Sequence, residues 1–310
     1  MMNDHEALSI FNHYSPSLRG LAYRVTGSTS DAEDAVQEVF IKWQKADKSN
    51  IETPAAWLTT VCTRQCLDML KAAHKVRVNY VGTWLPEPMI TVEGITPEDR
   101  LTPESHMELA SSLSMAFLLL LERLTPKERA AYLLKEIFAY NYAEVSSYIG
   151  IKEAACRKLV SRARANINQG DIRHNTPEET QKKLLNAFQD AIRNGQPAPL
   201  TELLSDDIQL TADGGGKVIA IQKTLEGILP VTNFLTNVLS PAWQNADLVT
   251  CELNSQLGLL LYEADQITAA LSFEYDGERE VKHIYILRNP DKLARLDDDF
   301  IKRKGVWWKR

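Results

Sequence analysis

The sequence predicts a multi-domain protein in which two all-α parts are followed by an α+β domain. Apolar residues recur with a helical period over residues 7–77, and again from about 105 to 168. Residues 79–107, which hold four prolines and five acids, separate the two helical parts. Beyond residue 176, one helix is followed by short runs of strand-forming residues, an order that is typical of an α+β domain.

The first helical part contains two strong helix signals. In "SDAEDAVQEVFIKWQKA" (30–46), Ser30 and Glu33 are spaced as a capping box. A core-facing stripe follows, formed by Ala32, Ala35, Val36, Val39, Phe40 and Trp43. A second helix is expected to begin at Pro54, after a Thr53 cap, and to run to about residue 77.

The second helical part has the outline of a helix-turn-helix. Thr125 and Pro126 open one helix, and residues 141–167 then read as a short helix, a turn at Gly150 and a longer helix. Its expected inner face consists of Ile151, Ala155, Leu159, Ala163 and Ile167.

The α+β part begins with a helix that Thr176, Pro177 and Glu179 open and Gly195 closes. Antiparallel-type strands are expected over 207–212, 217–222, 247–254, 257–264, 267–275 and 281–288, with a helix near 230–239. The turns are "DGGGK" (213–217) and "DGER" (276–279). For "DGGGK", an ordinary flexible hairpin and a docking site both remain open.

Positive charge is concentrated in one region of an acidic chain. The net charge is −6, yet residues 120–168 hold nine basic and five acidic residues, a local charge of +4. This predicts a defined anion-binding element and excludes a general polyanion binder. The charged face of the 151–167 helix is expected to meet nucleic acid, an anionic membrane or water, and the helix-turn-helix context favours nucleic acid.

Other classes of protein are not indicated. No apolar run approaches the roughly 20 residues of a membrane span, and the acidic N-terminal stretch does not indicate export, so a cytoplasmic protein is expected. The four cysteines lack metal-ligand spacing and are expected to be free thiols, with no metal or cofactor.

Long stretches of the chain resemble a known family. "DAEDAVQEVFIKW" resembles the polymerase-binding helix of sigma factors, and "TPAAWLTTVCTRQCLDML" the adjoining promoter-melting helix. Residues 124–167 are similar to the promoter-reading domain of the same family. The order and extent, about residues 5–168, match the small extracytoplasmic-function sigma factors. "WLPEP" (84–88), "DGGGK" and "NPDKL" (289–293) resemble the marks of a subgroup that carries a C-terminal SnoaL-like domain.

The resemblance implies four segments. Residues 1–80 would be sigma region 2, 81–107 an acidic linker, 108–170 sigma region 4, and 171–310 a cone-shaped SnoaL-like regulatory domain. It implies a factor that binds core RNA polymerase, recognises two-part promoter DNA, and is regulated in cis without a separate anti-sigma protein. The alternative is a helix-turn-helix regulator whose C-terminal domain senses a ligand.

The expected site residues fall into three groups. Promoter DNA is expected to meet Lys152, Arg157, Lys158, Ser161, Arg162 and Arg164 in the reading helix, and Lys48, Asn50, Thr60, Arg64 and Lys71 in the melting region. The polymerase is expected to meet Asp34, Gln37, Glu38 and Ile41. Interdomain regulatory contacts are expected from Trp84, Leu85, Pro86, Glu87 and Pro88, from Asp213, Gly214, Gly215, Gly216 and Lys217, and from Asn289, Pro290, Asp291, Lys292 and Leu293.

A catalytic role is not expected. Asp207, Asp213 and His283 are the acid/base candidates of the C-terminal part, and no two of them have the spacing of a dyad. His283 is either a satisfied core residue or an exposed one. A small-molecule ligand in a cavity of the cone remains open.

Overall fold

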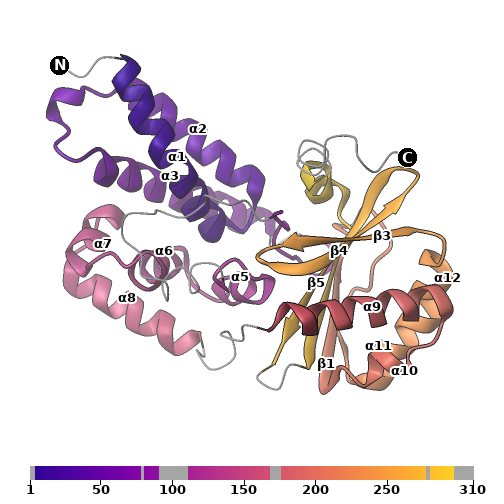
Figure 1. The fold of residues 1–310 in the computed structure, drawn as a ribbon. Helices are drawn as coiled ribbons and strands as arrows, with labels where there is room; N and C mark the ends of the chain where they lie inside the picture. The colour runs from indigo at the N-terminus through magenta and orange to yellow at the C-terminus, as the bar shows by residue number, and fades with distance from the viewer. Residues whose placement is uncertain (1–3, 78–79, 91–110, 168–175, 277–279, 297–310) are drawn as a thin grey trace. The chain divides into compact units, whose positions relative to one another are not determined.

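The computed structural model describes residues 4–77, 80–90, 111–167, 176–276 and 280–296, and it divides into two compact units (Figure 1). The first unit is formed by residues 1–78, 92–113 and 117–170, and the second by residues 79–91, 114–116 and 171–310. The "WLPEP" part of the linker therefore belongs to the same unit as the C-terminal domain. Among the described helices, none has the length and apolar character needed to cross a membrane.

The first unit begins with three packed helices, α1 (Asp4–Thr26), α2 (Thr29–Lys45) and α3 (Pro54–Arg77). The predicted stripe of α2 is confirmed, because all its members are buried except the half-buried Phe40, which packs on Phe11. Trp43 donates its indole hydrogen to the carbonyl oxygen of Ala7 over 2.8 Å. Pro54 begins α3 as predicted.

The predicted capping box of α2 is wrong by two residues. Ser28 is the N-cap, with extended backbone (φ −134°, ψ 127°), and its hydroxyl accepts from the Asp31 amide at 3.1 Å. Ser30 already lies within the helix, where its hydroxyl cannot take the N-cap position.

The rest of the first unit is formed by α5 (Met115–Leu121) from residue 117 onward, α6 (Pro126–Tyr132), the π-helical turn η3 (Leu133–Ile137), α7 (Tyr142–Ile149) and α8 (Glu153–Asn166). Thr125 and Glu128 form the capping box of α6. Gly150 has a left-handed backbone (φ 74°) and ends α7. The predicted helix-turn-helix is therefore confirmed as α7 and α8.

The predicted inner face of α8 is confirmed at Ala163 and Ile167 and is wrong at its other three positions. Cys156, Val160 and Ala163 are buried, followed by Ile167 just beyond the helix. Ala155 is exposed, and Ile151 and Leu159 are half-buried. In the first turns of α8, packing against α6 and α7 buries Cys156 and Val160, which lie one residue, about 100°, beyond the predicted Ala155 and Leu159.

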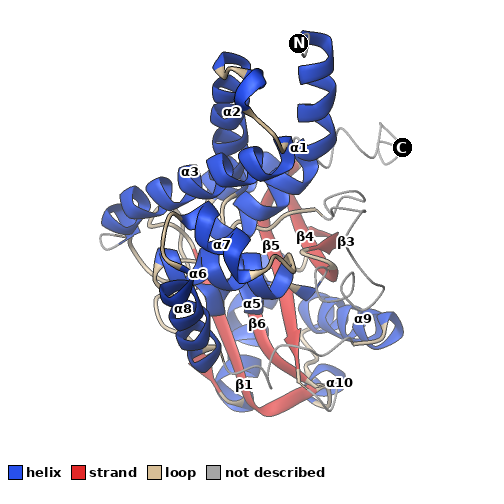
Figure 2. Ribbon diagram, turned by 90° about the vertical axis from the view of Figure 1, so that its left-hand side faces the viewer, coloured by secondary structure: helices blue, strands red, loops and turns tan. Residues whose placement is uncertain are grey.

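The second unit is built on a six-stranded sheet in the order β2-β1-β6-β5-β4-β3 (Figure 2). The strands are β1 (Leu204–Asp213), β2 (Leu225–Glu226), β3 (Asp247–Leu253), β4 (Gln256–Glu263), β5 (Gln266–Tyr275) and β6 (Val281–Leu287). The helices are α9 (Glu178–Asn194), α10 (Ala198–Thr201), α11 (Ile228–Phe234), the π-helical turn η5 (Leu235–Leu239) and α12 (Ser240–Trp243).

One face of the sheet and the helices share an apolar core. Leu184, Phe188 and Ile192 of α9 belong to the same cluster as alternate residues of the strands, such as Leu210, Leu271 and Ile284. In Figure 1, α9 lies across this sheet. The period-2 alternation that predicted the strands therefore also selects the face that meets the helices.

Three sequence predictions for this unit need correction. Strand β1 pairs with β6 in parallel, because four strands and the α11–α12 segment separate them in the chain and no hairpin fixes their relative direction. Residues 217–222 form no strand, and Ile219 is 90% exposed with its carbonyl bound to Arg288. Helix α9 begins at Glu178 with Pro177 as N-cap. The "DGER" turn, the predicted helix start near 105 and residues 91–107 of the linker lie outside the described residues.

Candidate nucleic-acid interface and linker site

The arginines of α8 are held by acidic side chains. Arg157 contacts Glu153 at 2.6 Å and lies 4.3 Å from the centre of the Tyr142 ring. Arg164 binds Glu136 with two bonds of 2.8 and 3.0 Å, and this pairing raises the pKa of Arg164. Arg162 lies 3.1 Å from Glu128. The structure therefore places all three predicted arginines on the surface of the helix-turn-helix, in pairs that DNA phosphates would have to replace.

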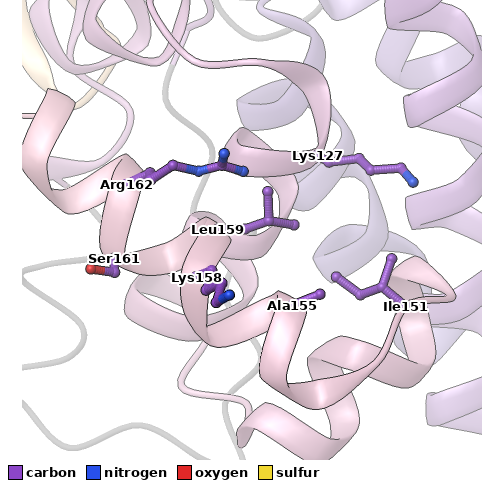
Figure 3. Close-up of a pocket in the computed structure, with 7 residues that line it drawn as sticks. All are labelled: Lys127, Ile151, Ala155, Lys158, Leu159, Ser161 and Arg162. Atoms are coloured by element: carbon purple, nitrogen blue, oxygen red, sulfur yellow. The ribbon is translucent and has the colours of Figure 1, made fainter.

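The lysines of the same region differ from the arginines. Within the described part of the chain, Lys127, Lys152 and Lys158 have no ion-pair or hydrogen-bond partner. Lys152 is the N-cap residue of α8 and makes no side-chain cap. Lys158 and the exposed Ser161 line a groove on this domain together with Lys127, which the sequence did not single out (Figure 3).

The predicted melting loop is a short ordered turn. Residues Lys48–Asn50 form a single 3₁₀ turn, η1, that Asp47 caps. The Asp47 carboxylate accepts from Ser49 and from the Asn50 amide at 2.9 Å, and the hydrogen bonds from Ser49 lower the pKa of Asp47. Lys48 donates to the Gln44 carbonyl and lies 5.3 Å from the Trp43 ring. Sequence reasoning missed Asp47, although Asp, Ser and Asn within four residues (47–50) are a known turn signal.

The remaining melting candidates on α3 are also engaged within the first unit. Thr60 donates to the Ala56 carbonyl at 2.7 Å, and Lys71 pairs with Asp68. Arg64 donates to the carbonyl oxygens of Ser147 and Tyr148, at 3.1 and 3.2 Å, at the end of α7. Arg64 thus stabilises the C-terminus of the first helix of the helix-turn-helix, where carbonyl groups lack partners.

The predicted polymerase face is free of core packing. Asp34, Gln37 and Glu38 are exposed on α2, and Ile41 is half-buried at the edge of this face. The buried stripe of α2 lies on the other side of the helix. The face combines acidic and amide groups with one apolar side chain.

Asp213 is the centre of a buried polar cluster at the linker. The residue is completely buried at the end of β1. One carboxylate oxygen accepts from the Tyr80 hydroxyl at 2.7 Å and from the Gly215 amide at 2.9 Å. The other accepts from the Leu85 amide at 3.0 Å and from the Lys292 ammonium at 2.7 Å. Burial, together with the hydrogen bond to Asp213, raises the pKa of Tyr80, so the phenol remains a donor.

Lys292 brings all three predicted motifs together. Its side chain is 8% exposed, and its ammonium group pairs with Asp213 and donates to the Leu85 carbonyl at 2.6 Å. The same ammonium lies 4.5 Å from the Trp84 ring and 5.0 Å from the Tyr80 ring. Leu85, Pro86 and Pro88 are buried, while Glu87 and Trp84 are half-buried.

The "NPDKL" motif acts as a helix start. Asn289 accepts from the Asp291 amide at 3.1 Å, Pro290 follows as the first helical residue, and residues 290–296 are helical. The Asn289 amide also donates to Tyr80 over 2.8 Å. On the exposed side, Lys217 pairs with Asp291 at 2.6 Å. Leu293 is buried.

The glycines of "DGGGK" are required by close packing. Gly215 has φ 62°, and a Cβ atom there would lie 2.4 Å from the Asn289 side-chain nitrogen. Gly216 has φ 70°, and a Cβ atom there would lie 2.9 Å from Val81. A flexible hairpin would need neither approach, so the docking alternative describes this turn better.

A second linker contact was not predicted. Two hydrogen bonds join Met89 and Asn254. The Met89 backbone amide donates to the side-chain oxygen of Asn254 at 3.1 Å, and the Asn254 backbone amide donates to the Met89 carbonyl at 2.8 Å. Ile90 forms an antiparallel bridge with Leu253 at the end of β3. Asn254 and Ser255 have positive φ angles in the turn between β3 and β4. An "NS" turn between two apolar runs was the available signal.

The acid/base candidates do not form a catalytic group. His283 is half-buried, and its Nε2 lies 2.8 Å from the Thr211 hydroxyl, so the imidazole has a hydrogen-bond partner, as the first alternative expected. Asp207 approaches Lys282 at 4.0 Å on the surface. Asp213 is occupied by the linker cluster. Within the described residues, no hydrogen bond or ion pair joins any two of these three side chains.

Comparison with known proteins matches each helical part. The Sigma-70 region 2 family matches residues 10–76, and the Sigma-70 region 4 family matches residues 114–167. The chain is 35% identical over 233 residues to the ECF RNA polymerase sigma factor SigJ of Mycobacterium tuberculosis, with 75% of this chain and 73% of that protein covered. It is 31% identical over 223 residues to the probable ECF RNA polymerase sigma factor SigI of the same species, with 71% and 74% covered.

The similarity continues through the C-terminal domain. The crystal structure of the Mycobacterium tuberculosis SigJ superposes with a TM-score of 0.70 at 29% identity, covering 93% of this chain and 98% of that one. Sigma factors direct transcription initiation and are not enzymes, which agrees with the engaged state of the three acid/base candidates. The two sigma regions, their order and the identity to SigJ together show that the chain belongs to the ECF RNA polymerase sigma factor family.

Proposed function

We propose that the C-terminal domain regulates this sigma factor in cis by holding the linker. The observation that carries the proposal is the buried Asp213–Lys292 pair, which binds both the amide and the carbonyl group of Leu85. The Met89–Asn254 contact provides a second anchor. In this proposal the fused domain takes the place of a separate anti-sigma protein.

The expected effect of docking is inhibition. Residues 80–90 span up to about 36 Å when extended, and this reach is lost while they are bound. Arg64 meanwhile binds the end of α7, so part of the melting helix lies against the reading domain. To reach two separated promoter elements, the factor has to release both the docked linker and the contact between Arg64 and α7. Release of the linker therefore raises transcription.

Within the sigma part, we assign the polymerase and promoter contacts to the elements that carry them in the family. We assign polymerase binding to the exposed face of α2 and promoter contacts to α8, η1 and α3, within segments 1–80 and 108–170. The linker 81–107 and the regulatory domain 171–310 complete the chain. Binding of a small-molecule ligand by the C-terminal domain remains a prediction.

The test is run-off transcription with the full chain, core RNA polymerase and fragments that the holoenzyme selects from genomic DNA. Lys292→Met is expected to increase transcription several-fold, because it leaves the Asp213 carboxylate without its counterion and removes the hydrogen bond to the Leu85 carbonyl. Lys282→Met is the matched control, since Lys282 is an exposed lysine of the same domain with only a 4.0 Å contact to Asp207.

Amide hydrogen exchange at Leu85 and Met89 reports docking separately from activity. The proposal predicts faster exchange at both amides in Lys292→Met. Faster exchange with unchanged or lower transcription would show that docking does not inhibit.

A further inference from the structure

A groove of about 560 Å³ lies on the helix-turn-helix domain, between the start of α6 and α8 (Figure 3). Its apolar lining consists of Ile151, Ala155 and Leu159, and its basic lining of Lys127, Lys158 and Arg162. In Figure 3, Leu159 projects into the space between Arg162 and Lys127. No acidic side chain belongs to the lining.

The apolar residues of this groove lie outside the buried core of α8. The core of α8 is made by Cys156, Val160 and Ala163. Ala155 is exposed, and Leu159 is only half-buried. A leucine in this position therefore presents apolar surface outward, between positive charges.

The lysines supply the uncompensated charge of this region. Arg157 and Arg164 are paired with Glu153 and Glu136, and they lie outside the groove lining. Lys127 and Lys158 are exposed and have no partner in the described part of the chain. Positive potential is thus concentrated where apolar surface is also available.

Duplex DNA fits this combination. Its phosphates are the anions for the lysines, and the 5-methyl group of thymine is the one apolar substituent that base edges present in the major groove. We infer that this groove reads a thymine: Leu159 and Ala155 contact the 5-methyl group, while Lys127 and Lys158 bind the flanking phosphates. The inference rests on the proposed promoter contact of α8 and names its specificity-determining residues, two of which are apolar.

The experiment uses the full chain in holoenzyme with core RNA polymerase. A duplex pool with a randomised upstream window is selected for binding. Each thymine of the selected element is then replaced in turn by deoxyuridine, which removes only the methyl group. One replacement is expected to weaken binding about four-fold, the effect of losing apolar contact with one methyl group.

Leu159→Ala is expected to weaken binding of the thymine duplex by a similar factor and to abolish the difference between thymine and deoxyuridine. This is a double-mutant cycle between one side chain and one methyl group. If the Leu159→Ala holoenzyme retains the full four-fold difference, the methyl group is read elsewhere and the inference is wrong. Circular dichroism of the variant checks that α8 is intact.

The contribution of the lysines is measured separately, from the salt dependence of binding. Lys127→Gln and Lys158→Gln are each expected to reduce the slope of log affinity against log salt concentration by about one, without changing the thymine preference. Lys182→Gln, an exposed lysine of α9 paired with Glu178, is the matched control. Unchanged slopes in both groove variants would place the groove off the DNA, as a surface for a protein partner.

The failure of this inference differs from failure of the proposed function. A holoenzyme that selects an upstream element and is insensitive to Leu159→Ala contradicts only the thymine contact. A holoenzyme that selects no upstream element contradicts both the thymine contact and the promoter role of α8.

Discussion

The ion pairs of the helix-turn-helix are more exposed to solvent than the ion pair of the linker site, and this difference in burial indicates different functions. In the three α8 pairs the arginine side chains are 48–65% exposed and the acids 45% (Glu153), 18% (Glu136) and 8% (Glu128), whereas Lys292 and Asp213 are 8% and 0% exposed. A pair whose arginine faces water contributes at most about 1 kcal/mol, so a phosphate can replace the acid as the partner of that arginine at little cost. A buried charge without its partner costs several kcal/mol.

The two regions therefore respond differently to a competitor. The α8 arginines can change partners one at a time, which suits a surface that must bind and leave DNA. The Asp213 carboxylate is satisfied by Tyr80, Leu85, Gly215 and Lys292 together. Removing the linker leaves two of these donors missing at once, so the linker site is expected to open as a unit.

The largest expected effect comes from leaving Asp213 unpaired. Lys292→Met should lower the free energy of unfolding of the C-terminal unit by about 3–5 kcal/mol, because a buried carboxylate loses its counterion. Lys292→Met combined with Asp213→Asn should recover part of this loss, because neither charge remains buried. Denaturant unfolding of the three proteins measures both differences. A loss below about 1 kcal/mol in Lys292→Met would mean that the pair behaves like the exposed pairs of α8.

A somewhat smaller effect is expected from pH at His283. Burial lowers the pKa of His283 to about 4, from an ordinary value of 6.5. As pH falls, the unfolded chain binds the proton first, so stability is present above pH 6.5 and is lost between pH 6.5 and pH 4. The loss attributable to this residue is up to about 3 kcal/mol. His283→Gln should remove it from the pH profile of unfolding, and a profile that is unchanged in the variant would contradict the assignment.

A third prediction compares two glycine substitutions, and it distinguishes the cost of a steric clash at the linker site from the cost of backbone strain. Gly215→Ala is expected to destabilise the second unit by about 1–3 kcal/mol, because the new Cβ meets Asn289, whose side chain is fixed by Tyr80 and Asp291. Gly82→Ala is the control, since Gly82 also has a positive φ of 83° but open space around its Cβ position. Equal losses in thermal unfolding would show that strain alone accounts for both.

Helix and strand positions were predictable where one face of the element is buried. The α2 stripe and the alternation in β5 and β6 place their apolar residues in the core as expected. The α8 face was not predictable, because Ala155 and Cys156 start two stripes of similar apolar character, and only packing against α6 and α7 selects between them. Residues 217–222 have a strand-like composition, yet the turns at Gly215 and Gly216 direct them away from the ladder.

The linker site was predictable in its motifs and not in its chemistry. Asp213, Lys292 and Leu85 lie in three segments separated by up to 207 residues, so only the fold brings them together. The polar partners Tyr80 and Asn254 carry no local signal for a long-range bond. Likewise, the sequence indicates which α8 residues are basic, while the structure separates the paired arginines from the free lysines.

The smallest expected effect comes from breaking an exposed ion pair, that of Arg164 with Glu136. Glu136→Gln frees Arg164 on α8, and it is expected to change the free energy of unfolding by less than about 1 kcal/mol. The released guanidinium can then meet a phosphate, so the holoenzyme should bind its selected duplex slightly more tightly at low salt, with a salt slope increased by up to about one. Arg164→Gln should shift the slope in the opposite direction or leave it unchanged. A loss of stability comparable to that of Lys292→Met would remove the distinction between an exchangeable surface pair and a buried one.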